Sequence, residues 1–338
     1  MRIIVDAMGG DNAPSEIVKG AVEAHKQFGH EIVLVGKEDA VKECLKNEGA
    51  LELSGITVKH AGDVIDMNDE PTAAIRRKKD SSMVVALNML KNGEGDAVVS
   101  AGSTGALLAG ATLLVRRIKG IRRACLAPTV PNIDKGFVLV DAGANAECVS
   151  EQLVQFAYMG SLYAERVLGF ENPRVALLNN GTEEHKGTPM HQETYQLLGK
   201  AEGINFVGNV EGSGVLFGDV DVVVTDGFAG NILLKSIEGT AKFVMKMLKE
   251  VLYASLKNKL AALVIKNDLG ALKDKMDPNN VGGTALLGVS KPVIKAHGSS
   301  TAPAIVNAIR QAAAFTESGF IKAIEDNIEN MRVSEAQE

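Results

Sequence analysis

Five apolar runs of this chain end in glycine-rich loops that carry Asp or Asn. Glycine lets backbone N–H groups approach an anion closely, and Asp or Asn can orient a donor or accept a proton. In an open parallel sheet, the carboxyl ends of the strands border one crevice, where ligands bind. We therefore expect an anion-binding rim built from the loops within residues 2–11, 97–106, 137–145, 175–188 and 221–231.

The loop at residues 179–188 is the most highly charged of the five. Lys186 and His185 can hold an oxyanion or a phosphate, and His185 can also transfer a proton. Asn180 and Gly181 precede them and offer an amide and a close backbone approach. An isolated charged loop is usually solvated surface, but a place beside four glycine turns favours a functional interpretation. Lys186 is the predicted cation of the site.

The remaining loops supply small, polar and acidic residues. Asp226 either acts as a base, orients a donor or is a simple turn residue. Asn231 follows it and can position a substrate oxygen. The loop at 100–106 leads into an apolar helix, whose free N–H groups and dipole favour a phosphate or a carbonyl oxygen. The first loop is equally well explained as a structural turn. Further candidates for binding substrate or phosphate are Asp6, Gly9, Gly10, Ser103, Thr104, Gly105, Asn145, Gly227, His297 and Ser299.

The sequence lacks the motifs of the common cofactor and metal sites. It contains no Walker A loop, no GxGxxG, no HExxH and no GxSxG. The three cysteines are scattered and form no CxxC pair, which is typical of a protein in a reducing cytoplasm. We expect neither a cofactor nor a metal.

Alternating strands and helices predict an α/β fold with a mostly parallel sheet covered on both faces. Val and Ile runs predict strands at 2–6, 31–35, 56–60, 96–100, 137–141, 174–178, 205–208, 221–225 and 292–296. Helices are expected at 15–28, 39–48, 83–92, 150–168 and 189–198. No Pro/Ser-rich linker interrupts the chain, which favours a single domain over residues 1–330.

Residues 237–276 depart from this alternation, because they are helical in pattern without a strand. Four leucines recur at helical spacing, and lysines surround them. One interpretation is a hairpin whose apolar stripe pairs with a second copy of the chain. The other is an apolar tip that rests on a membrane surface. The two are compatible if the base pairs and the tip stays free; the four leucines are Leu252, Leu256, Leu260 and Leu263.

The formal charge of −6 argues against a general nucleic-acid binder. No apolar stretch approaches the roughly 20 residues that a spanning helix needs. Two basic clusters stand against the negative total, and they are either solvated surface or a docking patch for an acidic partner. They contain Arg76, Arg77 and Lys78, and Arg116, Arg117, Arg122 and Arg123.

Six segments together resemble the bacterial PlsX family, the acyl-acyl-carrier-protein:phosphate acyltransferases. They are VDAMGGDNAP, NDEPTAAIRRKKDSSM, SAGSTGALLAG, VDAGAN, LLNNGTEEHKGT and TDGFAGNILLK, and the resemblance extends over residues 1–319. It implies transfer of a fatty acyl group from acyl-acyl-carrier protein to inorganic phosphate, which gives acyl phosphate for phospholipid synthesis.

The same resemblance implies a Rossmann-like α/β/α sandwich related to phosphotransacetylases, with a protruding helical hairpin. It also implies a homodimer and a cytoplasmic protein held peripherally at the inner face of the cell membrane. There the product would pass to a membrane glycerol-3-phosphate acyltransferase. Because acyl-carrier protein is strongly acidic, the two basic clusters are its expected docking surface.

The mechanism expected from these residues is direct attack of phosphate on the thioester, without a covalent enzyme intermediate. Lys186 and His185 hold phosphate, Asn180 and Asn231 position it or the oxyanion, and Asp226 orients or deprotonates it. A NAD-dependent β-decarboxylating dehydrogenase is one rival, but it needs a metal-binding aspartate cluster that the sequence lacks. A carrier-protein or membrane scaffold is the other, and it has no need for a phosphate rim.

Overall fold

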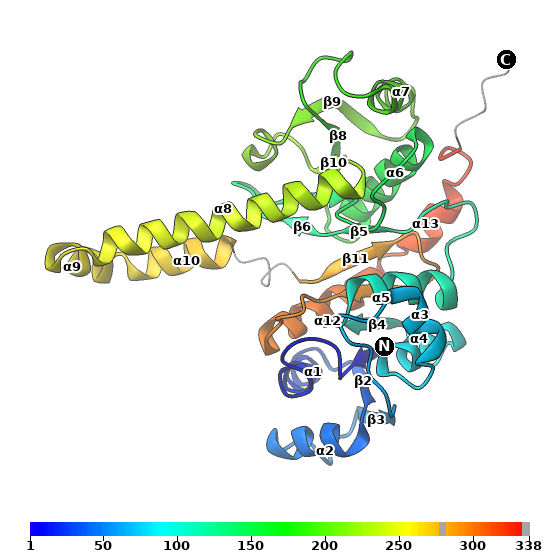
Figure 1. Cartoon of the computed structure of the whole chain (residues 1–338), viewed down its shortest axis with the longest axis vertical. Helices are drawn as coiled ribbons and strands as arrows, with labels where there is room; N and C mark the ends of the chain where they lie inside the picture. The colour runs from blue at the N-terminus through cyan, green and yellow to red at the C-terminus, as the bar shows by residue number, and fades with distance from the viewer. Residues whose placement is uncertain (277–281, 333–338) are drawn as a thin grey trace.

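The computed structural model describes residues 1–276 and 282–332 of the chain. Within them, twelve strands form two sheets that lie end to end between layers of helices (Figure 1). The first sheet has the order β3 (Ile56–His60), β2 (Glu31–Gly36), β1 (Arg2–Asp6), β4 (Ala97–Ser100), β12 (Val293–Lys295), β11 (Thr284–Leu287) and β5 (Cys125–Ala127). The second has the order β6 (Thr129–Val130), β7 (Phe137–Val140), β10 (Val222–Val224), β8 (Arg174–Asn179) and β9 (Asn205–Glu211).

Pairing is mostly parallel in both sheets, and the nine strands expected from the apolar runs are confirmed to within a few residues. The sequence did not reveal β5, β6 and β11, which are short and pair antiparallel. β5 and β6 follow one another and join the sheets, because β5 pairs with β11 and β6 with β7. The five glycine loops are therefore divided, two at the first sheet and three at the second.

Helices cover both faces of the sheets, so the expected α/β sandwich is confirmed. Ile3 and Val5 of β1 belong to the core cluster that includes α1 and α12, while Ile4 between them belongs to the cluster that includes α3, α4 and α5. This alternation follows from the two-residue period of a strand. The helices are α1 (Ser15–Phe28), α2 (Glu38–Asn47), α3 (Pro71–Arg77), α4 (Ser82–Asn92), α5 (Thr104–Gly110), α6 (Ser150–Arg166), α7 (Pro189–Leu198), α8 (Gly227–Tyr253), α9 (Leu256–Val264), α10 (Lys266–Met276), α12 (Ala302–Glu317) and α13 (Phe320–Asp326), with short turns η1 (Ala111–Val115) and η2 (Val215–Phe217).

Helix α8 leaves the sheets and projects far from the body of the protein (Figure 1). It begins at Gly227, directly after β10, which is earlier than the boundary at residue 237 expected from sequence. The start of α8 was not recognisable from sequence, because Gly227 and Gly230 have a low helix propensity. They are also the helix's buried residues, so α8 packs on the body at its base alone. No helix in the described ranges is both long and apolar enough to cross a membrane.

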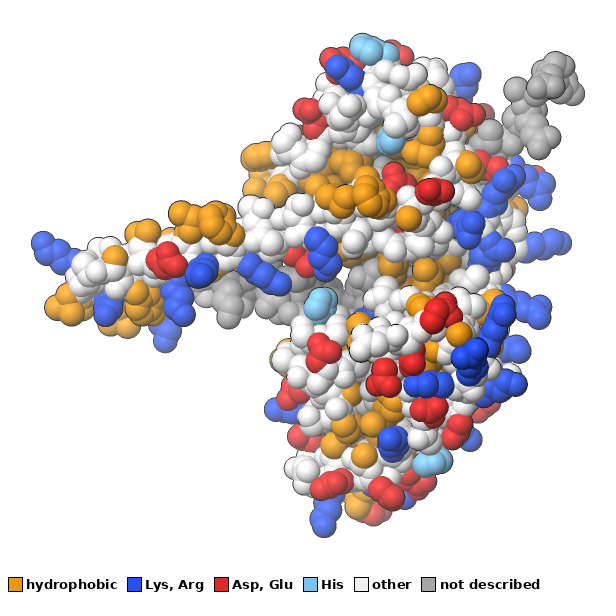
Figure 2. Space-filling model, in the orientation of Figure 1, with side chains coloured by type: hydrophobic (Ala, Val, Ile, Leu, Met, Phe, Trp, Pro, Cys, Tyr) orange, Lys and Arg blue, Asp and Glu red, His pale blue; other side chains and the backbone are white. Residues whose placement is uncertain are grey.

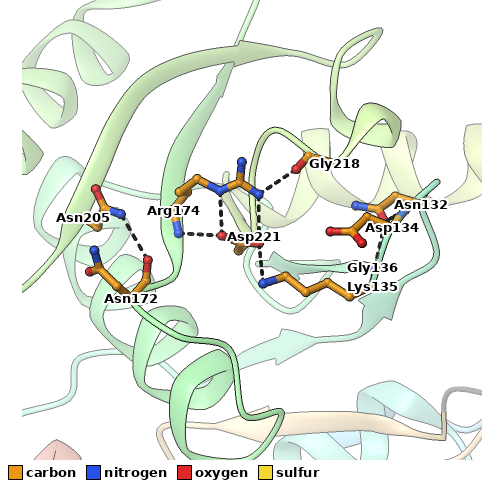
Figure 3. A network of polar contacts seen from close by, with 9 residues as sticks. All are labelled: Asn132, Asp134, Lys135, Gly136, Asn172, Arg174, Asn205, Gly218 and Asp221. Atoms are coloured by element: carbon orange, nitrogen blue, oxygen red, sulfur yellow. Dashed lines mark hydrogen bonds and ion pairs between the residues drawn. The ribbon is translucent and has the colours of Figure 1, made fainter.

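At the amino ends of β8 and β10, a polar network fixes the second sheet (Figure 3). Asp221 accepts hydrogen bonds from the backbone N and Nε of Arg174, at 2.8 and 2.9 Å. Lys135 Nζ lies 3.2 Å from Asp221, and Arg174 also donates to the Gly218 carbonyl. Burial of Asp221 opposes its ionisation, but these cations outweigh burial and hold the pKa of its carboxyl below the usual value.

Replacing Asp221 by Asn should destabilise the protein by about 3 kcal/mol at neutral pH, since it leaves two cations without their buried partner. Because the folded-state pKa of Asp221 is depressed, its stabilisation is present above the ordinary carboxyl pKa and is lost as pH falls. Thermal melts of the wild type and D221N should therefore converge toward acid pH. The exposed neighbour Asp219 provides the control D219N, which should melt like the wild type. Equal stability of D221N and the wild type at pH 7 would contradict this role.

Candidate active site

The loops after β1, β4 and β12 interlock through their glycines. A side chain at Gly9 would meet Asp6 Oδ2 and the Gly102 backbone N at 2.6 Å. One at Gly10 would meet the Gly298 carbonyl at 2.9 Å, and Gly10 has a positive φ of 104° that favours glycine. The Asp11 backbone N donates to Gly298 O at 2.7 Å. Gly9 and Gly10 thus allow the loops after β1, β4 and β12 to pack in direct contact, which is a structural role for this turn.

Two buried charged groups lie at the carboxyl end of the first sheet. Asp6 is 1% exposed and accepts a hydrogen bond of 2.6 Å from Ser100 Oγ. Burial raises the pKa of its carboxyl, although hydrogen bonds from Ser100 and Ser82 oppose the rise. Lys295, the last residue of β12, is 7% exposed. Its ammonium group donates to the carbonyls of Ala101 and Ala296, and so it ties the β4 and β12 loops together.

His297 lies on the β12 loop, where charges on α8 act on it. Its Nδ1 accepts a hydrogen bond from the Ser299 backbone N at 3.2 Å and lies 2.9 Å from Ser299 Oγ. Burial, followed by the nearby charges of Lys295 and Lys235, lowers the pKa of His297. Charges on α8, among them that of Lys235, act on His297, so this helix lies near the β12 loop. Figure 2 shows the surface hollowed between the base of α8 and the lower part of the molecule, and we call this hollow the crevice, with the β12 loop and α8 as its two walls.

The β7 loop is organised around Asp141, which is fully buried. Its carboxylate accepts hydrogen bonds from the backbone N–H groups of Leu126, Gly143, Ala144 and Asn145. Asn145 Nδ2 donates to Asp141 at 2.9 Å and to the Ala124 carbonyl at 2.8 Å. Both hydrogens of the Asn145 amide are thus engaged within the protein. Its side-chain oxygen is the atom left to contact a ligand.

The β10 loop leads directly into α8. Asp226 caps this helix, because its Oδ1 accepts hydrogen bonds from the backbone N of Phe228 and of Ala229 at 2.9 and 2.8 Å. Gly227 donates its backbone N–H to the Asn145 carbonyl at 2.7 Å, which joins the β7 and β10 loops. Asn231 is the fifth residue of α8 and lies against Gly143. Asp226, Gly227, Asn231 and Asn145 therefore form one group.

Amide side chains that donate to backbone carbonyls hold the charged β8 loop in place. Asn179 Nδ2 donates to the Lys186 carbonyl at 3.2 Å, and Gln192 of α7 donates to the His185 carbonyl. The aliphatic stem of Lys186 lies against Gly181, and its ammonium group is 3.9 Å from Glu183. His185 lines a hollow with Pro189 and Gln192 of α7, while Asn180 is exposed.

The structure thus places the predicted site residues in three groups. Asp6, Gly9, Gly10, His297 and Ser299 lie at the first sheet, together with Ser103, Thr104 and Gly105 at the start of α5. The β7–β10 group and the β8 loop lie at the second sheet, where His191 of α7 feels the charge of Asp226. No cluster of three or more potential metal ligands occurs in the ranges that the structure describes.

Sequence reasoning missed Lys295, Lys235 and Asp141. Asp141 falls at the end of the strand expected at 137–141, and its DAGAN context, a carboxylate followed by small residues, is the signal for a loop-capping role. Lys295 is a single charge in the apolar run PVIKA, which is a signal for a buried cation. Lys235 has no local signal, since it stands on an exposed helix face.

The two basic clusters lie near one another on connected elements. Arg76 and Arg77 are exposed at the end of α3, whose first residue, Pro71, lies against Gly105 at the start of α5. Lys78 is partly buried and pairs with Asp69 at 2.7 Å. Arg116, Arg117, Arg122 and Arg123 are exposed in the segment from η1 to β5, and Arg122 pairs with Glu151. Figure 2 shows Lys and Arg side chains gathered along the right-hand edge of this face.

A family model described as "Fatty acid synthesis protein" matches residues 1–323 of the chain. A phosphate acyltransferase of Thermoanaerobacterium thermosaccharolyticum is 50% identical over 329 residues, which cover 97% of each chain. One from Bacillus cereus is 51% identical over 313 residues, covering 92% of this chain and 93% of the relative. This chain belongs to the PlsX family of phosphate acyltransferases. It is an acyltransferase, as the sequence motifs predicted.

Solved structures of phosphotransacylases share this acyltransferase's fold. A phosphotransacetylase from Streptococcus pyogenes superposes with a TM-score of 0.61 at 18% identity, covering 96% of this chain and 94% of the other. A branched-chain phosphotransacylase from Enterococcus faecalis gives 0.59 at 16% identity, covering 94% and 99%. The predicted relation to the phosphotransacetylase fold is confirmed.

Proposed function

We propose that this acyltransferase moves a fatty acyl group from acyl-acyl-carrier protein to inorganic phosphate, releasing acyl phosphate for phospholipid synthesis. The observation that carries the proposal is that glycine loops and lysines occur together at the carboxyl ends of the strands in both sheets. Such a site suits a free phosphate and a thioester oxyanion, which both require backbone N–H groups and a cation.

In the proposed reaction, a phosphate oxygen attacks the thioester carbonyl carbon, a C–O bond forms and the C–S bond breaks. Lys186 and His185 hold phosphate from the β8 loop, and Asn180 and Asn231 position phosphate or the oxyanion. Asp226 orients or deprotonates phosphate through Oδ2, since its Oδ1 caps α8. The thiol leaves as a thiolate, which is a far better leaving group than an alkoxide.

Cys148 lies beside the β7–β10 group, with its Sγ 3.6 Å from the Asn145 carbonyl oxygen, and its environment favours the direct mechanism. Burial, followed by the charges of Asp141 and Asp226, raises the pKa of its thiol to about 12. A nucleophilic cysteine needs a depressed pKa, because the thiolate is the reactive form. Cys148 therefore lacks the thiolate needed to form an acyl-cysteine.

The decisive experiment follows loss of the acyl-carrier-protein thioester as inorganic phosphate is titrated. We expect loss that saturates with phosphate and a product that hydroxylamine converts to an acyl hydroxamate. Thioester loss independent of phosphate would refute the proposal, and no loss at all would favour a scaffold. A trapped acyl-serine or acyl-cysteine would refute direct attack, and a change in NADH absorbance with candidate acids would favour the dehydrogenase.

We further propose that the two basic clusters dock the acidic acyl-carrier protein. R76E combined with R77E should raise KM for the carrier thioester about tenfold at low salt and leave KM for phosphate unchanged. The effect should shrink as ionic strength rises. The control K26E reverses an exposed charge on α1 and should leave both constants unchanged. An unchanged KM for the thioester would remove this cluster from the docking surface.

Helices α8 and α9 expose a continuous series of large apolar side chains. Phe243, Met247 and Val251 of α8 are each half or more exposed, and Leu256, Leu260 and Leu263 of α9 are 79, 61 and 69% exposed. Figure 2 shows apolar atoms along the projection. Such a stripe requires a partner in water. We propose that α8 pairs with a second copy to form a homodimer, and that α9 rests on the inner face of the cell membrane.

A membrane-resting α9 shortens the path of an acyl phosphate to the membrane glycerol-3-phosphate acyltransferase that would use it. L256E combined with L260E should abolish co-sedimentation with anionic vesicles, because both charges would enter the apolar region. Leu252 is only partly exposed and is better left intact. L51E alters an exposed leucine before β3 and should bind vesicles like the wild type. Undiminished binding by the double variant would rule out this tip.

A further inference from the structure

Lys295 is a buried cation without an ion-pair partner. It is 7% exposed, and no carboxylate in the described part of the chain lies within ion-pair distance of its ammonium group. Its hydrogen bonds go to the carbonyls of Ala101 and Ala296, which are dipoles and carry no net charge. A buried charge is costly unless it is neutralised. The site is therefore built around a positive charge that the protein compensates only in part.

The charges around Lys295 show the same imbalance. Asp6 and Asp11 favour its charged form through space, and Lys235 opposes it. Burial is the largest influence and lowers the pKa of Lys295 to about 8. Asp6 is a poor counter-ion, because burial raises the pKa of its own carboxyl. An anion entering from the crevice would supply the missing charge.

His297 adds a directed donor at the same place. Its Nδ1 accepts the Ser299 backbone N–H, so the neutral ring carries its proton on Nε2. The burial and neighbouring cations that lower its pKa keep the ring neutral near pH 7. The hydroxyl of Ser300, 1% exposed on this loop, finds no hydrogen-bond partner among the described residues. The loop thus offers donors whose capacity the protein leaves unused.

Lys235 brings a second ammonium group from the opposite wall. It lies on α8, pairs with Glu238 at 2.9 Å and is about half exposed. Its charge acts on both Lys295 and His297, and that of Lys242, farther along α8, also acts on His297. Glu238 is the one acidic group of α8 that acts on His297. Glu238 on α8 and Asp11 on the β1 loop are the acidic groups that stand against these cations.

We propose that Lys295, His297 and Lys235 form a subsite for a phosphoryl anion between the β12 loop and α8. The inference rests on the proposed function, which provides two sources of such an anion. One is inorganic phosphate, the nucleophile. The other is the phosphodiester of the phosphopantetheine arm that carries the acyl thioester. In either case the buried Lys295 neutralises the charge of the anion. His297 Nε2 contacts the anion from the β12 loop, and Lys235 contacts it from α8.

Calorimetric titration of the whole protein with inorganic phosphate, phosphopantetheine and pantetheine tests the subsite. K295M should lower the affinity of the protein for the anion that occupies the subsite about 30-fold, since a buried charge-assisted hydrogen bond is lost. K235Q should lower the same affinity about threefold, as expected for an exposed charge. K246Q, on an exposed part of α8 beyond Lys242, should bind like the wild type. If K295M fails to fold, the affinity of K235Q for the phosphorylated probes tests the subsite on its own.

The two sources give different results. If K295M and K235Q both bind inorganic phosphate more weakly than the wild type, the subsite holds the nucleophile. If both variants bind phosphopantetheine more weakly while their affinity for pantetheine is unchanged, the subsite holds the phosphodiester of the carrier arm. Unchanged affinity for both phosphorylated probes overturns the subsite. Because binding needs no turnover, this result is separate from the proposed function, which fails if the wild type shows no phosphate-dependent thioester loss.

Discussion

Replacing Lys186 with alanine should lower kcat/KM for phosphate-dependent thioester loss by about 10²–10³-fold, as for other single donors to a developing oxyanion. The ammonium group of Lys186 is only loosely engaged, 3.9 Å from an exposed Glu183. An exposed pair of this kind contributes at most about 1 kcal/mol to stability. The loss should therefore appear in turnover and not in the thermal melt.

Two matched variants define what this result means. K200A removes an exposed lysine just beyond α7 and should retain full activity. K186R keeps the charge but changes its geometry, so it should recover part of the lost activity. Wild-type turnover in K186A would remove the β8 loop from the chemistry. The cation would then have to come from the β12 side of the crevice.

The strands and the α/β class were predictable because buried parallel strands appear as continuous Val and Ile runs. The runs at β1, β7 and β10 show this directly, and each ends at a loop where Asp or Asn begins. β5, β6 and β11 escaped prediction because their sequences, CLA, TV and TALL, contain no run of Val and Ile, and Pro128 and Pro131 interrupt the segment of β5 and β6. Their pairing depends on partners far along the chain.

The site was only partly predictable, for a related reason. The loops that carry Asp6, Asn145, Asp226 and Lys186 were recognisable from their local composition. The surroundings of Lys295 were not, because the carbonyl that it contacts in the β4 loop is 194 residues away. Likewise, two sheets cannot be distinguished from one by apolar runs alone. Which loops share a wall of the crevice is decided by packing between segments distant in sequence.

The second large effect should come from Gly230, where α8 packs against the body. A side chain at this position would overlap the Asp141 carbonyl and approach Thr225 at 2.9 Å. Both neighbours are rigid, since Asp141 and Thr225 are buried in the second sheet's loops. G230A should therefore displace the start of α8, which carries Asp226 and Asn231. We expect at least about 10²-fold lower kcat/KM, as misplacement of groups near the chemistry by 1 Å commonly costs.

G239A provides the control on the same helix. The space around Gly239 is open, with no atom near enough to meet an added side chain. Alanine there should preserve activity and raise the melting temperature slightly, because it favours the helix by up to about 1 kcal/mol. If G230A and G239A had equal activity, the base of α8 would not position the reacting groups. A loss confined to G230A would instead show that the placement of Asp226 and Asn231 depends on backbone contact between α8 and the β7 loop.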